Sequence, residues 1–228
     1  MLRGNHGKFL TSFRWMITRT PLTINKMVKS VLWRVPTSGN DKNVYLTFND
    51  GPHPQMTPWV MDRLKEAGDM KATFFCVGDQ GVKHPEMLED LKREGHEIAN
   101  HSQGHESGWS TSSKSYFRSY LECENTLGMT KRFRPPYGRI TPIQAKALST
   151  RTQIVMWDVL SGDYDRSLSG KQCLEQLKMQ TRPGSIVVFH DNERSANRLL
   201  YALPLYLEWL NLNDYEAKLL PDLKRCLE

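Results

Sequence analysis

Two side chains with carbonyl oxygens, Asn49 and Asp50, follow an apolar run at residues 44–46 and stand directly before Gly51-Pro52. The end of a strand is where α/β folds place catalytic groups. Hydrolytic metal sites commonly use two carboxylates at such a position, one to hold the ion and one to take a proton from water. Here the first of the two is an amide. The pair therefore predicts a metal site whose capacity for proton transfer depends on position 49.

Two histidines separated by three residues, His101 and His105, could bring both imidazoles to one point. A carboxylate from another loop would complete a three-ligand face and leave open positions for water and substrate, as a catalytic Zn²⁺ requires. Taken alone, the histidine pair is equally compatible with two residues on a polar turn. Because Asp50 and His190 also follow predicted strands, we favour a divalent metal site.

These residues need a scaffold, and the chain predicts one in which strands and helices alternate. We expect strands at 44–49, 72–77, 96–99, near 133, at 154–159 and at 186–189, and helices at 57–68, 85–95, 113–127, 142–148, 169–180 and 193–210. This order is typical of a parallel sheet wrapped by helices, the α/β class. About 190 residues are few for an eight-fold barrel, which usually takes about 250, so a barrel lacking one unit fits better.

The candidate polar residues all follow strands on the same side of that scaffold. Asp50 follows the first strand, the histidine pair the third, Arg134 the fourth, and His190 the last, with Asp163 shortly beyond the strand at 154–159. In a barrel of parallel strands the active site assembles at the carboxyl ends. We therefore expect these side chains to meet in one site.

The N-terminal 40 residues differ in charge from the rest. They contain seven Lys or Arg and no acid, which leaves 24 basic and 25 acidic residues in the remainder. A nearly neutral body argues against a nucleic-acid partner. The arm has the composition of a transit peptide or a membrane-surface segment, or is a packing element after a leader, and apolar spacing at 24–35 predicts a docking helix. We expect one domain, with a basic arm at 1–40, a barrel at 41–220 and a tail at 221–228.

Four cysteines without CxxC spacing argue against a disulfide framework or a structural zinc site. Scattered thiols are typical of a reducing compartment. No apolar stretch approaches the ~18 residues that span a bilayer, and no signal-peptide core follows the early basic residues. We predict a cytoplasmic protein without a membrane span, and the sequence leaves its oligomeric state open.

Five ordered segments carry a resemblance to a known family. They are Thr47-Phe48-Asn49-Asp50-Gly51-Pro52, His101-Ser102-Gln103-Gly104-His105, Arg134-Pro135-Pro136-Tyr137, the stretch from Trp157 to Tyr164, and Val188-Phe189-His190. Together they resemble the motifs of the polysaccharide deacetylases, the NodB-like enzymes of carbohydrate esterase family 4. The resemblance covers residues 22–218 and points to a compact subgroup of Bacteroidetes-like bacteria.

The resemblance implies a distorted (β/α)₇ barrel and a substrate partner that is an N-acetylated carbohydrate. Members remove acetyl groups from N-acetylglucosamine units, or O-acetyl groups from xylan, with zinc or a similar ion such as cobalt or nickel. It implies that Asp50, His101 and His105 are the metal ligands. It also implies that His190 is the general acid and that Asp163 orients its imidazole.

The resemblance also implies that Arg134 pairs with the catalytic base and that the backbone N–H of Tyr137 stabilises the oxyanion.

The chain departs from the family pattern in two places. The base should be an aspartate, but position 49 is Asn49, which cannot accept a proton at any working pH. Leu160 and Tyr164 replace an acid and a tryptophan of the fourth motif, which would reshape the pocket.

Several interpretations of Asn49 remain open from the sequence. The chain is a deacetylase with impaired activity, a variant inactivated to trap substrate, or a natural member with weak activity or with another base such as Asp191 or Glu106 reached through water. From another class, it is a non-catalytic carbohydrate-binding relative that keeps the metal. A hydrolase of cyclic amides or ureides on the same fold is a further option, and some of those enzymes work without a metal.

Overall fold

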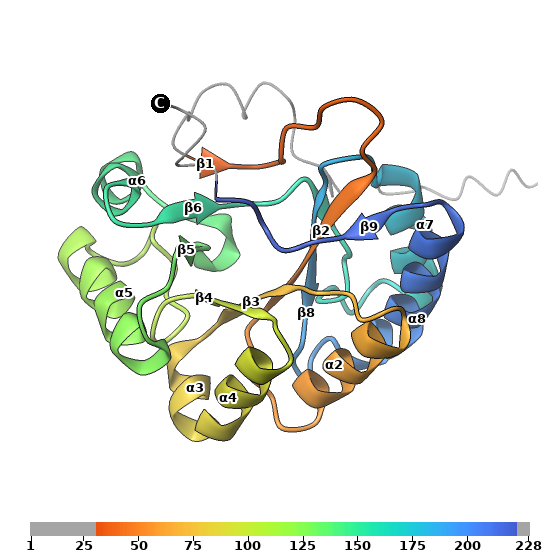
Figure 1. The fold of residues 1–228 in the computed structure, drawn as a ribbon. Helices are drawn as coiled ribbons and strands as arrows, with labels where there is room; N and C mark the ends of the chain where they lie inside the picture. The colour runs from red at the N-terminus through yellow and green to blue at the C-terminus, as the bar shows by residue number, and fades with distance from the viewer. Residues whose placement is uncertain (1–30, 223–228) are drawn as a thin grey trace, which may run out of the picture.

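A curved sheet of parallel strands forms the centre of the structure, a computed structural model that describes residues 31–222 (Figure 1). Its strands are β1 (Val31–Leu32), β2 (Asn43–Asn49), β3 (Thr73–Cys76), β4 (Glu97–Asn100), β5 (Arg132–Phe133), β6 (Gln153–Val155), β7 (Val159–Leu160), β8 (Ile186–His190) and β9 (Glu216–Ala217). The order across the sheet is β1-β6-β5-β4-β3-β2-β8-β7, and β9 pairs with β2.

Helices cover the outer, convex side of this sheet (Figure 1). They are α2 (Met56–Glu66), α3 (Gly78–Lys83), α4 (Pro85–Arg93), α5 (Ser113–Leu127), α6 (Pro142–Ser149), α7 (Gly170–Gln180) and α8 (Ala196–Leu212), with a 3₁₀ turn at Pro136–Gly138. Both α6 and α7 begin with a capping box, formed by Thr141 with Gln144 and by Ser169 with Gln172. Such reciprocal caps satisfy the free amides of the first helical turn.

The sheet curls into a barrel that stays open between its two edge strands. Among residues 31–222 no pairing joins β1 to β7, but the backbone N–H of Val35 donates to Gly184 O at 3.0 Å and Arg34 forms an antiparallel bridge with Ser185. This architecture confirms the predicted α/β domain with a distorted barrel.

The alternation of side chains along β2 places Asn49 inside the barrel. Successive strand residues point to opposite faces of a sheet. Leu46 and Phe48 join the apolar cluster that packs against the helices, and the Phe48 ring lies 5.0 Å from that of Phe74. Tyr45 belongs to a separate cluster on the inner face. Asn49 lies four residues further on the same face, at the carboxyl end of the strand.

Most predicted elements are present, and the helices at Pro85–Arg93 and Ser113–Leu127 begin where expected. Helix α2 begins at Met56, one residue before the predicted cap, and the Thr57 hydroxyl instead accepts a hydrogen bond from the His53 amide. Helix α3 and strand β9 were not predicted. Both are short, and α3 contains two glycines that weaken any helical pattern.

The predicted docking helix at 24–35 is wrong for the part that the structure describes. Val31 and Leu32 form β1, which pairs in parallel with Ile154 and Val155 of β6. Two adjacent apolar residues fit a helix face and a short buried strand equally well, so the spacing could not separate them. Residues 24–30, the remainder of that prediction, lie outside the described residues.

The single strand predicted at 154–159 is in fact two strands on different sides of the barrel. β6 pairs with β1 and β5, whereas β7 pairs with β8. Residues 156–158 make the crossing: Met156 N donates to Leu32 O at 2.7 Å and Asp158 N to Ile186 O at 3.1 Å. The buried Asp158 also accepts from Arg182 and Ser185. The mostly apolar pattern at 154–159, which Asp158 interrupts, therefore concealed a segment that links the two edges of the sheet.

Three of the cysteines, Cys76, Cys123 and Cys173, are free and buried, and Cys226 lies outside the described residues. Within residues 31–222, no helix has the length and apolar character needed to cross a membrane.

Candidate active site

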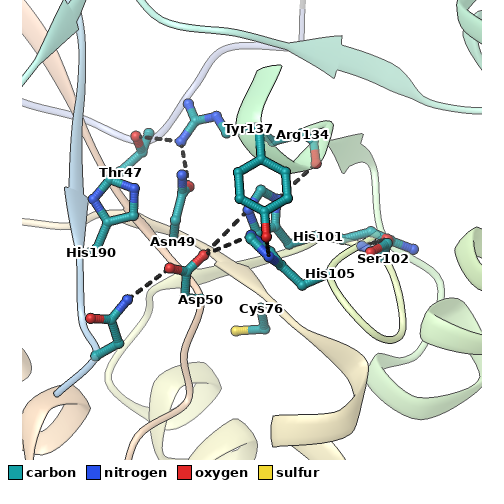
Figure 2. A network of polar contacts seen from close by, with 12 residues as sticks. Thr47, Asn49, Asp50, Cys76, His101, Ser102, His105, Arg134, Tyr137 and His190 are labelled. Atoms are coloured by element: carbon teal, nitrogen blue, oxygen red, sulfur yellow. Dashed lines mark hydrogen bonds and ion pairs between the residues drawn. The ribbon is translucent and has the colours of Figure 1, made fainter. Parts of the chain in front are cut away.

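Asp50, His101 and His105 meet at the carboxyl ends of β2 and β4 (Figure 2). Asp50 Oδ1 lies 3.5 Å from His101 Nε2 and 3.2 Å from His105 Nε2, and one potential ligand atom of each residue lies within 4.8 Å of the others. Asp50 Oδ1 is buried and has no hydrogen-bond donor. A buried carboxylate oxygen facing two imidazole nitrogens is the donor set of a divalent metal site.

Both imidazoles are oriented through their second nitrogen. His101 Nδ1 lies 2.7 Å from the carbonyl oxygen of Arg134, and His105 Nδ1 lies 3.1 Å from the hydroxyl of Tyr137. A carbonyl oxygen can only accept, so Nδ1 of His101 carries the proton and Nε2 is left as a ligand. This is the outer-shell arrangement expected around a metal-binding histidine.

The charge states of His101 and Asp50 also suit a cation. Burial lowers the pKa of His101 to about 4, so its ring is neutral at neutral pH. Burial opposes ionisation of Asp50, but its close contacts with His101 and His105 outweigh it and hold the Asp50 pKa well below its ordinary value. Metal ligands must be deprotonated, and the pKa shifts of His101 and Asp50 both favour that form.

Asn192 holds the other oxygen of Asp50, and the sequence did not single it out. Asn192 Nδ2 donates to Asp50 Oδ2 at 2.7 Å, and Asn192 Oδ1 accepts from the Ser195 amide at 3.0 Å. The second bond fixes which end of the amide faces Asp50. The only signal that could have found Asn192 is its position two residues after His190, at the same end of the barrel.

His190 and Asp163 form a second polar group beside the candidate metal site. His190 Nδ1 lies 2.7 Å from Asp163 Oδ1, while the His190 amide donates to Asp163 Oδ2 at 2.8 Å. Burial disfavours the imidazolium, yet the Asp163 carboxylate outweighs it and raises the His190 pKa above its ordinary value. The Tyr164 ring packs edge-on against His190 at 5.3 Å. The predicted acid is therefore oriented and biased toward its protonated form.

Asn49 and Arg134 occupy the position where a base and its arginine were expected. Arg134 is fully buried, and its Nη1 donates to Asn49 Oδ1 at 2.9 Å and to Thr47 Oγ1 at 2.8 Å. Its Nε and Nη2 donate to the carbonyls of Val155 and Met156. No carboxylate among the described residues contacts this guanidinium. The oxygen of Asn49 is committed to Arg134, and its remaining polar group is an NH₂, which only donates.

Three residues of the site have left-handed backbone conformations. They are Asp50 (φ 76°), His105 (φ 60°) and Tyr137 (φ 59°). Each such non-glycine residue costs about 1–3 kcal/mol, and such strain concentrates at functional sites. Tyr137 precedes Gly138, where an added Cβ would lie 2.6 Å from the Trp157 ring. The turn at 136–138 is therefore packed against a wall of the site and cannot easily relax.

A cleft of about 630 Å³ opens above these residues. It is lined by Asn49, Asp50, His101, His105, Tyr137, Arg139, Trp157, Leu160, Tyr164, His190, Asn192 and Arg194. This volume is typical of small-ligand sites. A smaller cleft of about 340 Å³ lies between α2 and α8, and its lining includes no histidine or cysteine.

The two alternative bases do not line the cleft. Asp191 is fully buried, its Oδ2 accepts from the Thr57 hydroxyl, and burial raises its pKa to about 7. The carboxylate of Glu106 accepts from the Ser119 hydroxyl at 2.6 Å. Each of the two side chains is thus held by a hydroxyl on a helix, Thr57 on α2 and Ser119 on α5. Asp50 is the one acidic residue that lines the cleft, so Asp191 or Glu106 could act there only through water, and that alternative stays a prediction.

Comparison with known proteins identifies the family. Residues 37–152 match the family model described as polysaccharide deacetylase. One peptidoglycan-N-acetylglucosamine deacetylase of Bacillus cereus is 30% identical over 201 residues, which cover 86% of this chain and 87% of the relative. Another from the same organism is 33% identical over 157 residues, covering 66% of this chain and 56% of the relative. This chain thus spans little more than half of that second relative.

A solved structure of a peptidoglycan N-acetylglucosamine deacetylase, bound to an N-hydroxybenzamide, superposes with a TM-score of 0.80 at 28% identity. The match covers 89% of this chain and 95% of that one. Fold and sequence agree with the resemblance that the five segments carry, while the bacterial subgroup stays a prediction. The chain belongs to the polysaccharide deacetylase family.

Proposed function

We propose that this protein binds N-acetylglucosamine-type sugars at a divalent metal site and hydrolyses their acetamide slowly, because Asn49 stands where the proton acceptor is needed. The observation that carries the proposal is the contact between Asn49 Oδ1 and Arg134 Nη1 at 2.9 Å. An amide occupies the place of a carboxylate, and nothing else lining the cleft takes over. The sugar specificity comes from the named relatives, which are peptidoglycan-N-acetylglucosamine deacetylases.

Asp50, His101 and His105 would hold the cation. A bound divalent ion, zinc in the first instance, would polarise the acetyl carbonyl and lower the pKa of a nearby water toward neutrality. Asn192 and the carbonyl of Arg134 would keep two of the ligands oriented. The Tyr137 hydroxyl would support the third ligand.

On the other side of the cleft, His190 would deliver a proton to the leaving amine. Asp163 accepts from the opposite ring nitrogen, so Nε2 faces away from the carboxylate and toward the cleft that His190 lines. The raised pKa keeps a larger share of the imidazole protonated at neutral pH. The Tyr137 amide is the proposed donor to the developing oxyanion.

The missing group is the one that takes a proton from the attacking water. General bases typically contribute about 10²–10⁴-fold to a rate. Asn49 cannot supply this, so we expect intact metal and sugar binding with a turnover reduced by about that factor.

The unpaired thiols support a reducing, cytoplasmic location.

The test is to measure metal content, glycan binding and acetate release on one preparation. The zinc-loaded protein should bind an N-acetylglucosamine tetramer and release acetate slowly, and a chelator should abolish that release. Binding that survives with no acetate release at any enzyme concentration would favour the second candidate, a non-catalytic sugar-binding protein. Turnover of a cyclic amide that persists after chelation would contradict the proposal.

A further inference from the structure

Helices α5 and α6 and the loops around them carry basic side chains and almost no acid. The stretches 107–121 and 125–157 together hold eight Lys or Arg and neither Asp nor Glu. The rest of the chain beyond residue 40 holds 16 basic and 25 acidic residues. A body that is nearly neutral as a whole therefore has its positive charge gathered over α5 and α6.

Six of these eight basic side chains are exposed. They are Lys114 and Arg118 on α5, Arg139 before α6, Lys146 on α6, and Lys131 and Arg151 in the connecting loops. Lys114 and Arg118 are four residues apart and so lie on the same face of α5. Within residues 31–222, the salt bridge that these stretches supply is the buried one between Arg132 and Glu97. The six exposed cations therefore face solvent without a bridging carboxylate.

Two large apolar side chains stand exposed among these cations. Trp109 is 68% exposed and Ile143 is 73% exposed. The Arg139 guanidinium carbon lies 5.2 Å from the Trp109 ring centroid, and Lys146 follows Ile143 by three residues on the same face of α6. Exposed apolar side chains surrounded by polar ones are typical of an interaction surface.

The loop that carries Trp109 is fixed against the start of α6. The buried Gln144 donates through Nε2 to Gly108 O at 3.0 Å, and the Gly108 amide donates to Arg139 O at 3.0 Å. These contacts join the tryptophan, the isoleucine and the cations into one surface. We call the surface formed by Trp109, Ile143 and the six exposed cations the basic–apolar face.

The hollow between α5 and α6, within the basic–apolar face, is small. It measures about 60 Å³, and its lining includes Phe117 and Ala147. Clefts for small ligands usually measure about 300–1,000 Å³, so the face fits a broad surface better than an inserted ligand. A nucleic acid would pair with the cations but leave Ile143 in water. An anionic bilayer suits both, because its headgroups attract Lys and Arg while Trp and aliphatic side chains enter the interface.

We infer that the basic–apolar face docks the protein on the surface of an anionic phospholipid bilayer. The cations would contact the headgroups, and Trp109 and Ile143 would enter the boundary between headgroups and acyl chains. Arg139 also lines the cleft, so docking would hold the mouth of the cleft beside the bilayer. The inference goes beyond the proposed function and requires neither a bound metal nor turnover.

The experiment measures co-sedimentation of the full chain with vesicles of phosphatidylcholine, with and without phosphatidylglycerol. We expect binding to the mixed vesicles that weakens in high salt, and little binding to phosphatidylcholine alone. Each Lys or Arg near an anionic surface contributes about 5-fold in affinity, so Lys114→Gln together with Arg118→Gln should weaken binding about 10- to 30-fold. The matched control is Lys171→Gln together with Lys178→Gln on α7, at the other side of the sheet (Figure 1), and it should have a much smaller effect.

Apolar variants separate a bilayer from a soluble polyanion. Trp109→Ala and Ile143→Ser should each weaken vesicle binding about 3- to 10-fold, because less apolar surface enters the interface. Leu212→Ser, at the end of α8 and 76% exposed in the natural chain, is the control and should leave vesicle binding unchanged. Binding of heparin, a soluble polyanion, should not respond to Ile143→Ser. Thermal unfolding of each variant checks that it is folded.

Residues 1–40 hold seven further Lys or Arg and stay unchanged in every variant. If the Lys114→Gln, Arg118→Gln chain binds mixed vesicles as tightly as the natural chain, or if the α7 control loses as much, the basic–apolar face is not the docking surface. The inference also fails if the natural chain ignores mixed vesicles, or if Trp109→Ala and Ile143→Ser both bind them undiminished. None of these outcomes bears on acetate release, which tests the proposed function separately.

Discussion

Two buried arginines on and next to β5, Arg132 and Arg134, point into the same barrel and are satisfied in opposite ways. Arg132 pairs with the carboxylate of Glu97 and also donates to Leu220 O at 2.6 Å. Arg134, two residues later, has only neutral acceptors: one amide, one hydroxyl and two backbone carbonyls. Residues two apart share a face, so the difference lies in their partners and not in their orientation.

The two arginines differ in where they lie relative to the cleft. Arg132 and Glu97 form a structural contact, since neither residue lines the cleft. Arg134 lies beneath the cleft, with its guanidinium 4.0 Å from the Phe75 ring centroid. Burial lowers its pKa, and no carboxylate offsets that cost. A carboxylate at position 49 would be the natural partner of the Arg134 guanidinium, so the missing negative charge is traced to Asn49.

The largest loss of unfolding free energy should come from replacing Arg132, the arginine that is paired with a carboxylate. Arg132→Met leaves the Glu97 carboxylate without its cation, and removing one member of a buried pair typically costs about 3–5 kcal/mol. Arg134→Met strands no carboxylate, so its loss of unfolding free energy should be smaller. Chemical denaturation of both variants measures this. A greater loss of unfolding free energy for Arg134→Met would mean that the partners of Arg134 stabilise the fold more than the Arg132–Glu97 pair does.

The pH dependence of these variants sharpens the distinction. Burial already raises the Glu97 pKa above its ordinary value of 4.5, and without Arg132 it should rise further. A carboxyl whose folded pKa is raised destabilises the fold most at pH values above that pKa, and this penalty shrinks as pH falls from the folded pKa to the unfolded one. The deficit of Arg132→Met should therefore shrink on acidification toward pH 4.5, whereas that of Arg134→Met should not. Parallel curves for the two variants would contradict this.

The metal site offers an intermediate effect. Asn192→Ala removes the donor to Asp50 Oδ2, and losing an outer-shell partner typically weakens metal affinity by about 10–100-fold. Asn192→Ser is the matched control, because its hydroxyl could still accept from the Ser195 amide but is too short to replace the long amide arm. Zinc dissociation constants, measured by chelator competition, should be raised in both. Affinity that is lost in the alanine variant and retained in the serine variant would assign the effect to the Ser195 contact.

The smallest effect concerns the neutral partners of Arg134. Thr47→Val removes an acceptor from the guanidinium and a donor from Val187 O, which should cost about 1 kcal/mol in unfolding free energy. In an Asn49→Asp background the cost should fall, because a carboxylate would hold Arg134 more strongly. A double-mutant cycle measures the coupling. Additive effects would show that positions 47 and 49 do not share the charge of Arg134.

The sequence was sufficient for the parts of the site that lie at strand ends in regular spacing. His101 and His105 could be paired because three residues separate them, and Asp50 because it ends a clear strand. Asn192 could not be found, because its role depends on how the loop after β8 folds back over β2. The same limit hid the division at residues 156–158, where the chain crosses from one sheet edge to the other and only Asp158 interrupts the apolar pattern.

The measurement that decides most directly is the rate of acetate release from an N-acetylglucosamine tetramer by the zinc-loaded Asn49→Asp variant, beside the natural chain and Asn49→Gln. A carboxylate at position 49 would accept a proton and pair with Arg134, so we predict a gain of about 10²–10⁴-fold for Asn49→Asp, none for Asn49→Gln, and unchanged zinc content in all three. If Asn49→Asp binds zinc and the tetramer as the natural chain does but releases acetate no faster, the amide at position 49 is not what limits this protein.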